Sequence, residues 1–338
     1  PRTSSAASDV YKRQNLDPTI IVGGVVKSLE SNSVLGGGDT FVVEADEYNK
    51  SLLHLSPTIA VINNIDFEHI ECYNDIDDLK DTFLQFANSV PFYGTVCACK
   101  DSNNVASILS KIDKPIITYG IKSQNVDIKA ENLHQENGTI SFDVKVKDQI
   151  FSVNLCVPGK YNAYNALAAL SVCETMGIDL ESACKALSNF SGVKRRFDIK
   201  ANKDIMIIDD YAHHPVEVQN VIETVKSNWN KNLNVIFQPH LFSRTKEFYK
   251  DFAKALMIAD NVMITEIFGS REKEDNSTTS DLIINEMLKL NHKNVSYVSS
   301  KDIVEEVKSR GVKGDIFLTM GVGNIWRYAE ELGKHHND

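Results

Sequence analysis

The chain has 338 residues, of which 42% are hydrophobic, so it can bury a large core, and domains of roughly 100 to 200 residues would make two of them. Its 36 basic and 46 acidic residues give a formal net charge of -10, which argues against nucleic acid or an anionic membrane surface as a partner because both require a positive field. The six cysteines lack CxxC spacing, no apolar run reaches the ~18 residues of a membrane span and no secretion signal opens the chain, so we predict reduced thiols, no membrane insertion and a cytoplasmic location.

The first fourteen residues, PRTSSAASDVYKRQ, show neither periodicity nor apolar mass. We therefore predict that residues 1–14 are a non-native or disordered leader, and the hexapeptide DVYKRQ also matches what a common transposon adapter would encode. We expect the native protein sequence to begin at Asn15 and to come from a reading frame that is incomplete at its N-terminal end.

Residues 41–119 alternate short β-branched runs, namely FVVE, IAVINNI, TVCAC and PIITY, with helical patterns. Such alternation predicts a parallel sheet flanked by helices. From residue 127 to 157 the alternation changes to period two, with a turn at Asn137-Gly138. This change predicts a small antiparallel β insertion in the first domain.

Helical patterns cover residues 162–176 and 180–190, and the stretch 192–196 then interrupts them. We place the domain boundary there. Residues 15–195 are predicted to form a central ATP-binding domain, and residues 196–338 a C-terminal domain.

The C-terminal region repeats a strand and a helix five times, which predicts a second, Rossmann-like α/β domain. In such folds, ligands bind beyond the carboxyl ends of the strands. Polar clusters follow four of the predicted strands, at residues 209–214, 239–244, 266–271 and 321–323. The binding groups of this domain are therefore expected along one edge of its sheet.

Acidic and histidine side chains also follow two predicted strands of the first domain. Glu44 and Asp46 come directly after FVV, and Glu68 and His69 come after IAVINNI. Two such strand ends, side by side, would bring Glu44 and His69 to one magnesium ion, which prefers hard oxygen ligands supplemented by water and phosphate oxygens. Alternatively, the acidic pair caps the next helix and His69 is a structural histidine.

The segment PGKYNAYNALAAL places Asn162 and Asn165 three residues apart, on one face of the opening turn of a helix. Because an asparagine amide both donates and accepts hydrogen bonds, the pair suits the edge of an adenine. The alternative is that Asn162 only caps the helix.

Arginines stand at the domain junction and after a later strand. Arg195 and Arg196 lie at the junction, where an arginine can stabilise the charge of a transferring phosphoryl group, although a solvated hinge is the alternative. The segment FQPHLFSRT places His240 and Arg244 at a strand end, where they suit a phosphate or a carboxylate.

In the segment IIDDYAHHP, Asp209 and Asp210 end a buried strand, and Pro215 begins a helix. His213 and His214 therefore lie at a helix N-terminus, which disfavours imidazolium and welcomes an anion. A hydrolytic metal site is the alternative, but the spacing lacks the HExxH or cysteine-rich pattern of such sites.

No phosphate-loop segment of the form G-x-x-x-x-G-K-[ST] occurs, and the three glycines at residues 36–38 are not followed by the required Lys and Ser or Thr. Every other kind of group expected around a nucleoside triphosphate is present. The fold class that we predict is therefore α/β, with an incomplete P-loop-type ATPase domain followed by the Rossmann-like domain.

Taken in order, the segments NLDPTIIVGG, EADE, NIDFEH, PFYG, PGKYNAYNA, GVKRRFD, DDYAHHP, FQPHLFSRT and GVGNIW resemble the Mur ligase family of peptidoglycan synthesis. The resemblance extends from Asn15 to nearly the end of the chain. It implies a three-domain enzyme, of which this chain keeps most of the central ATPase domain and all of the C-terminal domain but lacks the domain that binds the UDP sugar.

The resemblance implies that ATP phosphorylates a substrate carboxylate and that an amino group attacks the acyl phosphate to form an amide. The members that this chain resembles most join L-alanine to UDP-N-acetylmuramate, so these two molecules are the expected substrates, and ATP and Mg²⁺ are the expected cofactors. No oligomeric state is indicated. The polypeptide by itself is expected to be inactive because its phosphate loop is missing.

For the central domain, the resemblance assigns Glu44 and His69 to magnesium and Asn162 and Asn165 to adenine. The sequence departs from the common family pattern at Glu68, where an Asp often precedes the histidine. This departure is mild because the carboxylate is kept.

For the C-terminal domain, the resemblance assigns Arg196 to phosphate and Asp210 to the nucleotide ribose. Either His213 or His214, together with Arg244, would face the amino acid or the reacting carboxyl group.

Two further departures fall in this domain, Ala212 where Gly is frequent and Leu241 where many members carry Arg, so we leave Leu241 out of the site.

Two other functions stay open. One is the recycling ligase that attaches a ready-made tripeptide to the same sugar nucleotide, which the uninterrupted run from EADE to HLSPTIAVINN disfavours. The other is a non-catalytic nucleotide-binding module.

Overall fold

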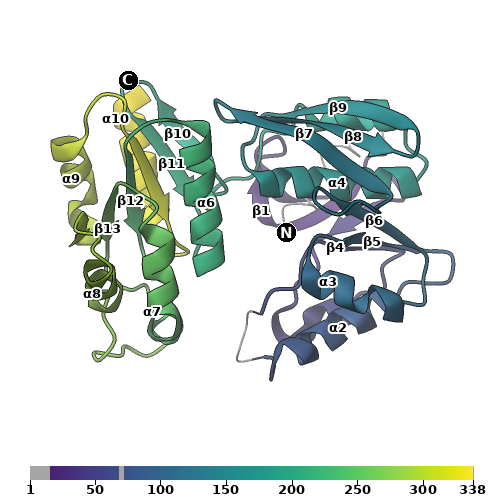
Figure 1. The fold of residues 1–338 in the computed structure, drawn as a ribbon, viewed down its shortest axis with the longest axis horizontal. Helices are drawn as coiled ribbons and strands as arrows, with labels where there is room; N and C mark the ends of the chain where they lie inside the picture. Colours follow the sequence, from purple (N-terminus) through teal and green to yellow (C-terminus); the bar gives the residue numbers. More distant parts are fainter. Residues whose placement is uncertain (1–15, 68–71, 338) are drawn as a thin grey trace. The chain divides into compact units, whose positions relative to one another are not determined.

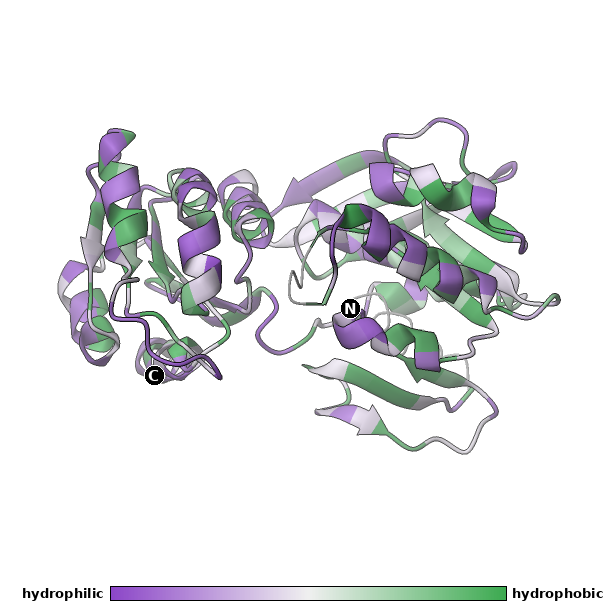
Figure 2. Cartoon of the chain, turned by 90° about the horizontal axis from the view of Figure 1, so that it is seen from below, coloured by the Kyte–Doolittle hydropathy of each residue, from purple (hydrophilic) through white to green (hydrophobic). Residues whose placement is uncertain are grey.

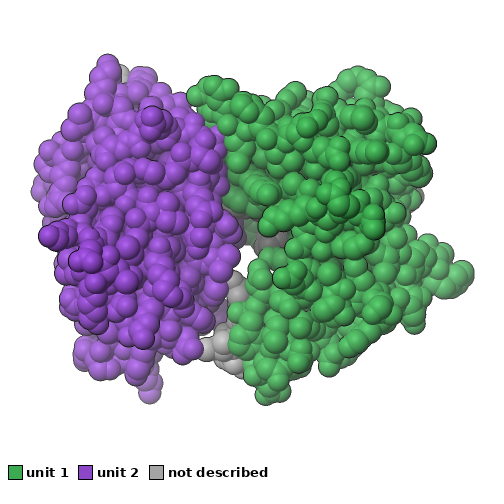
Figure 3. Space-filling view, viewed as in Figure 1, with its two compact units in different colours: residues 1–192 green, residues 193–338 purple. Residues whose placement is uncertain are grey.

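The computed structural model describes residues 16–67 and 72–337. The predicted leader, residues 1–14, and the predicted metal ligand His69 lie outside the described residues. The chain divides into two compact units, Pro1–Gly192 (unit 1) and Val193–Asp338 (unit 2), which Figure 3 colours separately. From the sequence pattern we place the domain boundary between residues 195 and 196.

Among its described residues, unit 1 contains two sheets, and the smaller has the strand order β2-β1-β3. β1 pairs antiparallel with β2 and parallel with β3. The strands are β1 (Thr19–Val26), β2 (Ser31–Val34) and β3 (Phe41–Val43). The backbone N–H of Glu44 extends the pairing by donating to the carbonyl of Ile21 over 2.9 Å. Glu44 thus comes directly after a strand, as the sequence predicts.

The next strand, β4 (Ile59–Ile62), belongs to the other sheet, where it pairs with β5. The prediction that the strands FVV and IAVI lie side by side in one parallel sheet is therefore wrong for this structure. β3 uses β1 as its parallel partner instead. Periodicity identifies strands but not their neighbours, and the apolar run TIIV of β1 supplies the neighbour that the sequence pattern did not reveal.

The larger sheet of unit 1 has the order β4-β5-β6-β7-β8-β9. Its further strands are β5 (Thr95–Cys99), β6 (Ile116–Gly120), β7 (Ile128–Glu136), β8 (Thr139–Val146) and β9 (Gln149–Leu155). The predicted antiparallel meander is confirmed as β7 to β9. β7 also pairs in parallel with β6, so the meander continues the main sheet and is not a separate insertion.

Helices cover both faces of this sheet (Figure 1). The helical segments of unit 1 are η1 (Tyr48–His54), α2 (Ile76–Asn88), α3 (Asn103–Ile108), η2 (Leu109–Lys111), α4 (Lys160–Thr175) and α5 (Leu180–Leu187). Asp75 starts α2, because its carboxylate accepts from the backbone N–H groups of Asp77 and Asp78. α2 then packs Leu79 and Phe86 into a core with β4 and β5. α4 packs on β5 to β8.

Unit 2 contains the five predicted strand and helix repeats. Its sheet has the order β10-β11-β15-β12-β13-β14. The strands are β10 (Asp198–Asn202), β11 (Met206–Asp210), β12 (Leu233–Phe237), β13 (Asn261–Ile264), β14 (Val295–Tyr297) and β15 (Ile316–Met320). β10, which the sequence pattern did not predict, pairs antiparallel with β11, whereas the other pairs are parallel. The mixed α/β class with parallel sheets is confirmed.

The helices of unit 2 bury both faces of its sheet. They are α6 (Pro215–Asn228), α7 (Phe242–Leu256), α8 (Asp281–Lys289), η3 (Ser300–Asp302), α9 (Ile303–Arg310) and α10 (Ile325–Asn337). α6, α7 and α8 enclose one apolar cluster with the sheet, and α9 and α10 enclose the other. Every residue of β11, β12 and β15 is buried, and the strands accordingly carry mainly hydrophobic colours in Figure 2. Across the described part of the chain, no helix has the length and apolar character that crossing a bilayer requires.

Candidate functional site

Polar side chains of unit 2 meet beyond the carboxyl ends of β11 and β12 and at the starts of α6 and α7. This edge is where ligands bind in doubly wound folds. We call the group the histidine–arginine cluster. Its members are Arg196, Tyr211, His213, Glu217, His240 and Arg244.

His213 is held through its Nδ1 atom, which lies 3.1 Å from the carbonyl oxygen of Tyr211 and 3.3 Å from Oε2 of Glu217. A carbonyl oxygen only accepts, so Nδ1 carries the proton and Nε2 has the lone pair. Burial lowers the pKa of His213 to about 4; Glu217 opposes this shift, whereas Arg244 and Arg196 add to it. At neutral pH, His213 is therefore an uncharged side chain with an accepting Nε2.

His240 and Arg244 form the other half of the cluster. Nη1 of Arg244 lies 3.3 Å from Nδ1 of His240, and a guanidinium only donates, so His240 carries its own proton on Nε2. Burial lowers the pKa of His240 to about 4, and the nearby His213 and Arg244 lower it further. The two imidazole rings lie edge to face with their centres 5.7 Å apart. The cluster thus combines a neutral acceptor with a neutral donor.

Arg195 holds the loop that follows β15. It donates to the carbonyl oxygens of Gly321 over 2.6 Å and Val322 over 3.1 Å. Its Nε also lies 3.4 Å from Oδ2 of Asp209, which is fully buried. Thr319 donates to the other oxygen of Asp209 over 2.7 Å. Arg195 is therefore a structural arginine and not a solvated hinge.

Arg196 contacts two other members of the histidine–arginine cluster. Its guanidinium carbon lies 5.0 Å from the ring centre of Tyr211, and its Nη1 lies 3.9 Å from Oε1 of Glu217. The residues on both sides, Arg195 and Phe197, have left-handed φ angles of 61° and 48°. Such angles are uncommon for these residue types and persist where the surroundings enforce them.

Asp210 holds the backbone of this turn in place. Its Oδ2 accepts from the backbone N–H of Phe197 over 2.7 Å, and its Oδ1 accepts from that of Ala212 over 2.8 Å. The residue is fully buried, so both oxygens serve the backbone. The carboxylate therefore fixes the turn that presents Arg196, and the contact of Asp210 with a ribose stays a prediction. For the alternative of a hydrolytic metal site at DDYAHHP, the described residues offer no group of three His, Cys, Asp or Glu side chains that could hold an ion.

The structure separates the two adjacent histidines. The backbone N–H of His214 donates to Glu217 over 3.3 Å, and its ring packs edge to face on Phe248 of α7 at 5.3 Å. His213, by contrast, faces His240. Of the two histidines that the sequence leaves open, His213 is the one in the cluster.

The sequence pattern singles out neither Tyr211 nor Glu217, whereas it names His240 together with Arg244 as suited to a phosphate or a carboxylate. One signal for Glu217 was available. A helix that begins at Pro215 places Glu217 at its third residue, where a glutamate side chain can accept from the unpaired N–H groups at the helix start.

In unit 1, Asn162 and Asn165 share a hydrogen bond of 3.3 Å at the start of α4. Asn162 is buried, and its Nδ2 donates to the carbonyl of Pro158 over 2.6 Å. Asn63, which follows β4, lies 3.5 Å from Oδ1 of Asn165. The N-cap of α4 is Gly159, so the alternative that Asn162 merely caps this helix is wrong. The three amides form a connected row beside the carboxyl end of β4.

Glu44 accepts from the backbone N–H of Gly23 over 2.7 Å through Oε2. A Cβ atom at Gly23 would lie 3.0 Å from Oε1 of Glu44, so a glycine leaves room for the carboxylate. Asp46 accepts from the N–H of Tyr48 over 2.9 Å, but the N-cap of the following helix, η1, is Glu47, so neither residue of the acidic pair is its N-cap. Among the described residues, no three His, Cys, Asp or Glu side chains gather as a complete metal site, and His69 lies outside them. Glu44 supplies a hard oxygen that fits magnesium, and its sharing of an ion with His69 stays a prediction.

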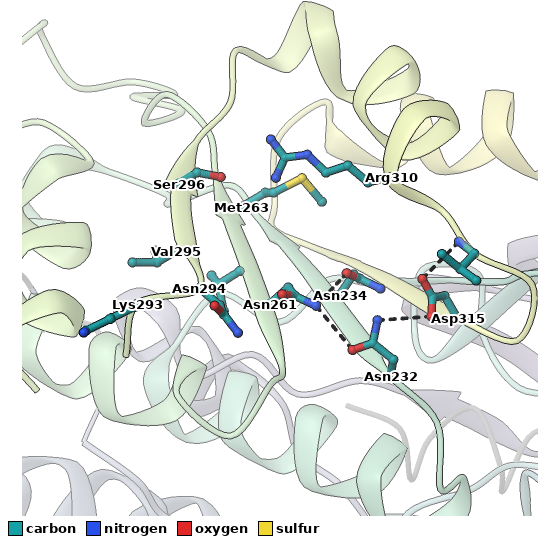
Figure 4. A pocket seen from close by; sticks show the side chains of 12 residues that line it. Asn232, Asn234, Asn261, Met263, Lys293, Asn294, Val295, Ser296, Arg310 and Asp315 are labelled. Carbon is teal, nitrogen blue, oxygen red and sulfur yellow. Dashed lines mark hydrogen bonds between the residues drawn. The ribbon is translucent and has the colours of Figure 1, made fainter. Parts of the chain in front are cut away.

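A polar pocket of about 590 Å³ opens at the amino ends of β12 and β13, at the opposite edge of the unit 2 sheet (Figure 4). Its asparagines bond to one another, since Nδ2 of Asn261 lies 3.3 Å from Oδ1 of Asn232 and 3.1 Å from Oδ1 of Asn234. Asn232 also donates to Asp315 over 3.1 Å. These side chains tie the strand starts together. The histidine–arginine cluster, and not this pocket, is therefore the candidate functional site of unit 2.

Both units match known protein domains. Residues 24–173 match the Mur ligase middle domain, and residues 195–323 match the glutamate ligase domain of Mur ligases. Together these matches define the class of the protein, a ligase built from Mur domains. The chain belongs to the Mur ligase family.

Two relatives in sequence carry the same name. A UDP-N-acetylmuramate–L-alanine ligase from Geotalea uraniireducens is 39% identical over 333 residues, which are 98% of this chain and 72% of that protein. The protein of the same name from Endomicrobium trichonymphae is 40% identical over 333 residues, or 98% of this chain and 73% of that protein.

Solved structures of Mur ligases have a similar fold. The UDP-N-acetylmuramate-alanine ligase of Thermotoga maritima has a TM-score of 0.83 and 27% identity, covering 99% of this chain and 73% of that chain. The fold is also shared by a MurF ligase of Thermotoga maritima in complex with ADP, with a TM-score of 0.76 and 18% identity over 99% of this chain and 77% of that chain.

Proposed function

We propose that this chain acts in the ATP-dependent joining of L-alanine to UDP-N-acetylmuramate, a step of peptidoglycan precursor synthesis. The observation that carries the proposal is the 39% identity, over 98% of the chain, to a ligase of that name. The histidine–arginine cluster supports it. Two arginines and two neutral imidazoles at one sheet edge suit an amino acid that reacts beside a phosphoryl group.

The proposed reaction has two steps. A carboxylate oxygen of the sugar nucleotide attacks the γ-phosphorus of ATP, and ADP leaves with the electron pair of the broken bond. The amino group of L-alanine then attacks the carbonyl carbon of the acyl phosphate, loses a proton and expels inorganic phosphate. Both steps place negative charge on phosphoryl oxygens, so fixed cations and accurate positioning supply most of the catalysis.

We assign three roles within the cluster. Arg196 stabilises the phosphoryl charge, and Arg244 pairs with the carboxylate of L-alanine. His213 accepts a hydrogen bond from the amino group through Nε2. The lowered pKa of His213 supports this role, because an imidazole that stays uncharged does not repel an incoming ammonium group.

The cofactor assignments concern unit 1. We propose that Asn162 and Asn165 bind adenine and that Glu44, with His69, holds Mg²⁺, which would neutralise phosphate charge when bound. The ADP in the MurF structure that shares this fold supports a nucleotide site. The printed sequence contains no phosphate-loop segment, so we propose that the 338-residue polypeptide by itself does not hydrolyse ATP at a useful rate.

The test uses the protein expressed from its genomic locus, so that any coding sequence beyond the printed residues is included. It receives UDP-N-acetylmuramate, ATP and Mg²⁺ with either L-alanine or the tripeptide, and mass spectrometry identifies the product. We expect the alanyl product. Phosphate release with the tripeptide alone would identify the recycling ligase instead, and no turnover with either would favour a nucleotide-binding module.

Arg196→Ala tests the proposed mechanism in the same assay. We expect turnover to fall by about 10³-fold, with ATP affinity changed only a few-fold, because a phosphoryl-stabilising arginine acts mainly in the transition state. Lys194→Ala is the matched control, since Lys194 is an exposed cation two residues away. An unchanged rate in Arg196→Ala would remove this arginine from the mechanism.

A further inference from the structure

Glu217 lies between the two halves of the proposed chemistry. Its Oε2 accepts from the backbone N–H of His213 over 3.1 Å and from that of His214 over 3.3 Å, and the same oxygen lies 3.3 Å from Nδ1 of His213. Its Oε1 lies 3.9 Å from Nη1 of Arg196. One carboxylate therefore contacts both the imidazole and the arginine of the cluster.

The charge of Glu217 fits this position. Burial alone would raise its pKa, but His213, Arg196 and the two backbone donors outweigh burial, so the pKa is lowered. Glu217 is consequently ionised at neutral pH. An anion here complements the guanidinium of Arg196 and favours the tautomer of His213 that has its proton on Nδ1.

Helix capping does not account for all of these contacts. Asp75 at α2 and Asp179 at α5 cap their helices with acceptor bonds from backbone N–H groups of the first turn. Glu217 instead accepts from the backbone N–H groups of His213 and His214, which precede α6. In addition, it reaches the ring of His213 and an arginine on a separate segment. The additional contacts are the ones that involve the proposed reactive groups.

We propose that Glu217 is a positioning residue that fixes His213 relative to Arg196. Through one oxygen it orients the imidazole that meets the amino group, and through the other it restrains the guanidinium that meets the phosphoryl group. The inference rests on the proposed function for the identity of those two partners. The coupling of Glu217 to His213 can be measured without that function.

Two substitutions separate positioning from capping. Glu217→Gln keeps an oxygen that accepts from the backbone N–H groups but loses the charge, whereas Glu217→Ala loses both. Glu223→Gln is the matched control, because Glu223 is exposed on the same helix, where it accepts a hydrogen bond from Gln219 over 2.7 Å.

In the ligase assay with the product of the whole gene, we expect kcat to fall about 10-fold in Glu217→Gln and about 100-fold in Glu217→Ala, with the KM for ATP changed by less than about 3-fold. The control variant should match the wild type. The proposal would be overturned if Glu217→Gln kept the wild-type kcat and Glu217→Ala lost activity only in proportion to its loss of folded protein. That result would show that Glu217 acts only as a helix cap.

The second readout uses the 338-residue chain without substrate. Ring-nitrogen NMR signals of His213, identified by their loss in His213→Gln, should report a proton on Nδ1 in the wild type. In Glu217→Ala, where the carbonyl of Tyr211 is the remaining acceptor for Nδ1, they should report a larger share of the tautomer with its proton on Nε2. Glu223→Gln should leave them unchanged. Unchanged signals in both Glu217 variants would overturn the inference even if the ligase activity is found. If no ligase activity is found, the proposed function fails and these signals still decide whether Glu217 fixes His213.

Discussion

Nη1 of Arg244 lies 3.3 Å from Nδ1 of His240, so a permanent cation donates to the nitrogen that a second proton would occupy. The contact opposes the imidazolium form. Burial is the larger cause of the lowered pKa of His240, but the part due to Arg244 can be removed by a substitution. This relationship allows a direct test of how the cluster controls its own charge.

Arg244→Ala should raise the pKa of His240 from about 4 by about one unit, because a neighbouring positive charge disappears while burial stays. NMR titration of the His240 ring, identified with His240→Gln, measures the change. Arg244→Lys keeps a charge and should give a smaller rise. Lys246→Ala removes an exposed cation from the same helix and should have no effect. A pKa that stays the same or falls in Arg244→Ala would contradict the contact.

Substitutions of Arg195 and Arg196 should differ in how much they lower the free energy of unfolding of unit 2. Arg195→Ala leaves the buried carboxylate of Asp209 and two carbonyl groups without their cation, so we expect unit 2 to lose about 2 to 3 kcal/mol. Arg196→Ala should cost less than about 1 kcal/mol, because its ion pair is partly exposed. Urea unfolding followed by tryptophan fluorescence measures both, since the two tryptophans of the chain, Trp229 and Trp326, both lie in unit 2. Equal losses would mean that the two arginines share one structural role.

Asp210→Ala should destabilise unit 2 by about 2 to 4 kcal/mol, because two buried backbone N–H groups lose their acceptor. Asp210→Asn keeps one oxygen acceptor and should cost less. The same fluorescence measurement applies, with Asp204→Asn as the control, since the ion pair of Asp204 with Lys313 lies on the surface. A stable Asp210→Ala variant would show that the carboxylate is available for another partner, such as the predicted ribose.

The periodic parts of the fold could be predicted from the sequence because periodicity reports burial. The apolar runs of β11, β12 and β15 are buried throughout and were recognised as strands. The edge strand β10, with the sequence DIKAN, alternates irregularly between buried and exposed positions and was missed. The partner of β3 was also missed, because strand order depends on contacts between distant segments.

The same limit applies to the site. Arg196, Arg244 and the pair of His213 and His214 could be named as candidates because each stands in a short motif at a strand end or at the domain junction. The structure brings Arg196, His213 and Arg244 into one cluster. The sequence places Asp210 at the end of a buried strand, but its hydrogen bond with the backbone of Phe197 could not be predicted, since it depends on the left-handed turn at residues 195–197. Glu217 resembles any surface glutamate of a helix until its contacts with separate segments are known.

Unit 2 should lose stability as the pH falls through the range in which its histidines are protonated only when unfolded. Burial lowers the pKa of both His213 and His240 from 6.5 to about 4, so between these values the unfolded chain binds protons that the folded chain does not. Each histidine therefore contributes stability above pH 6.5 that falls by up to about 1.4 kcal/mol per pH unit toward pH 4. Asp209 acts in the opposite direction, because burial raises its pKa from 3.8 to about 6 and its contribution falls as the pH rises through that range. The test compares how steeply the free energy of unfolding changes with pH, measured by urea unfolding with tryptophan fluorescence from pH 4.5 to 7. This slope should be smaller in His240→Gln than in the wild type. His335→Gln, a substitution of an exposed histidine, should keep the wild-type slope. An equal slope in His240→Gln would mean that this imidazole is protonated as readily in the folded chain as in the unfolded one.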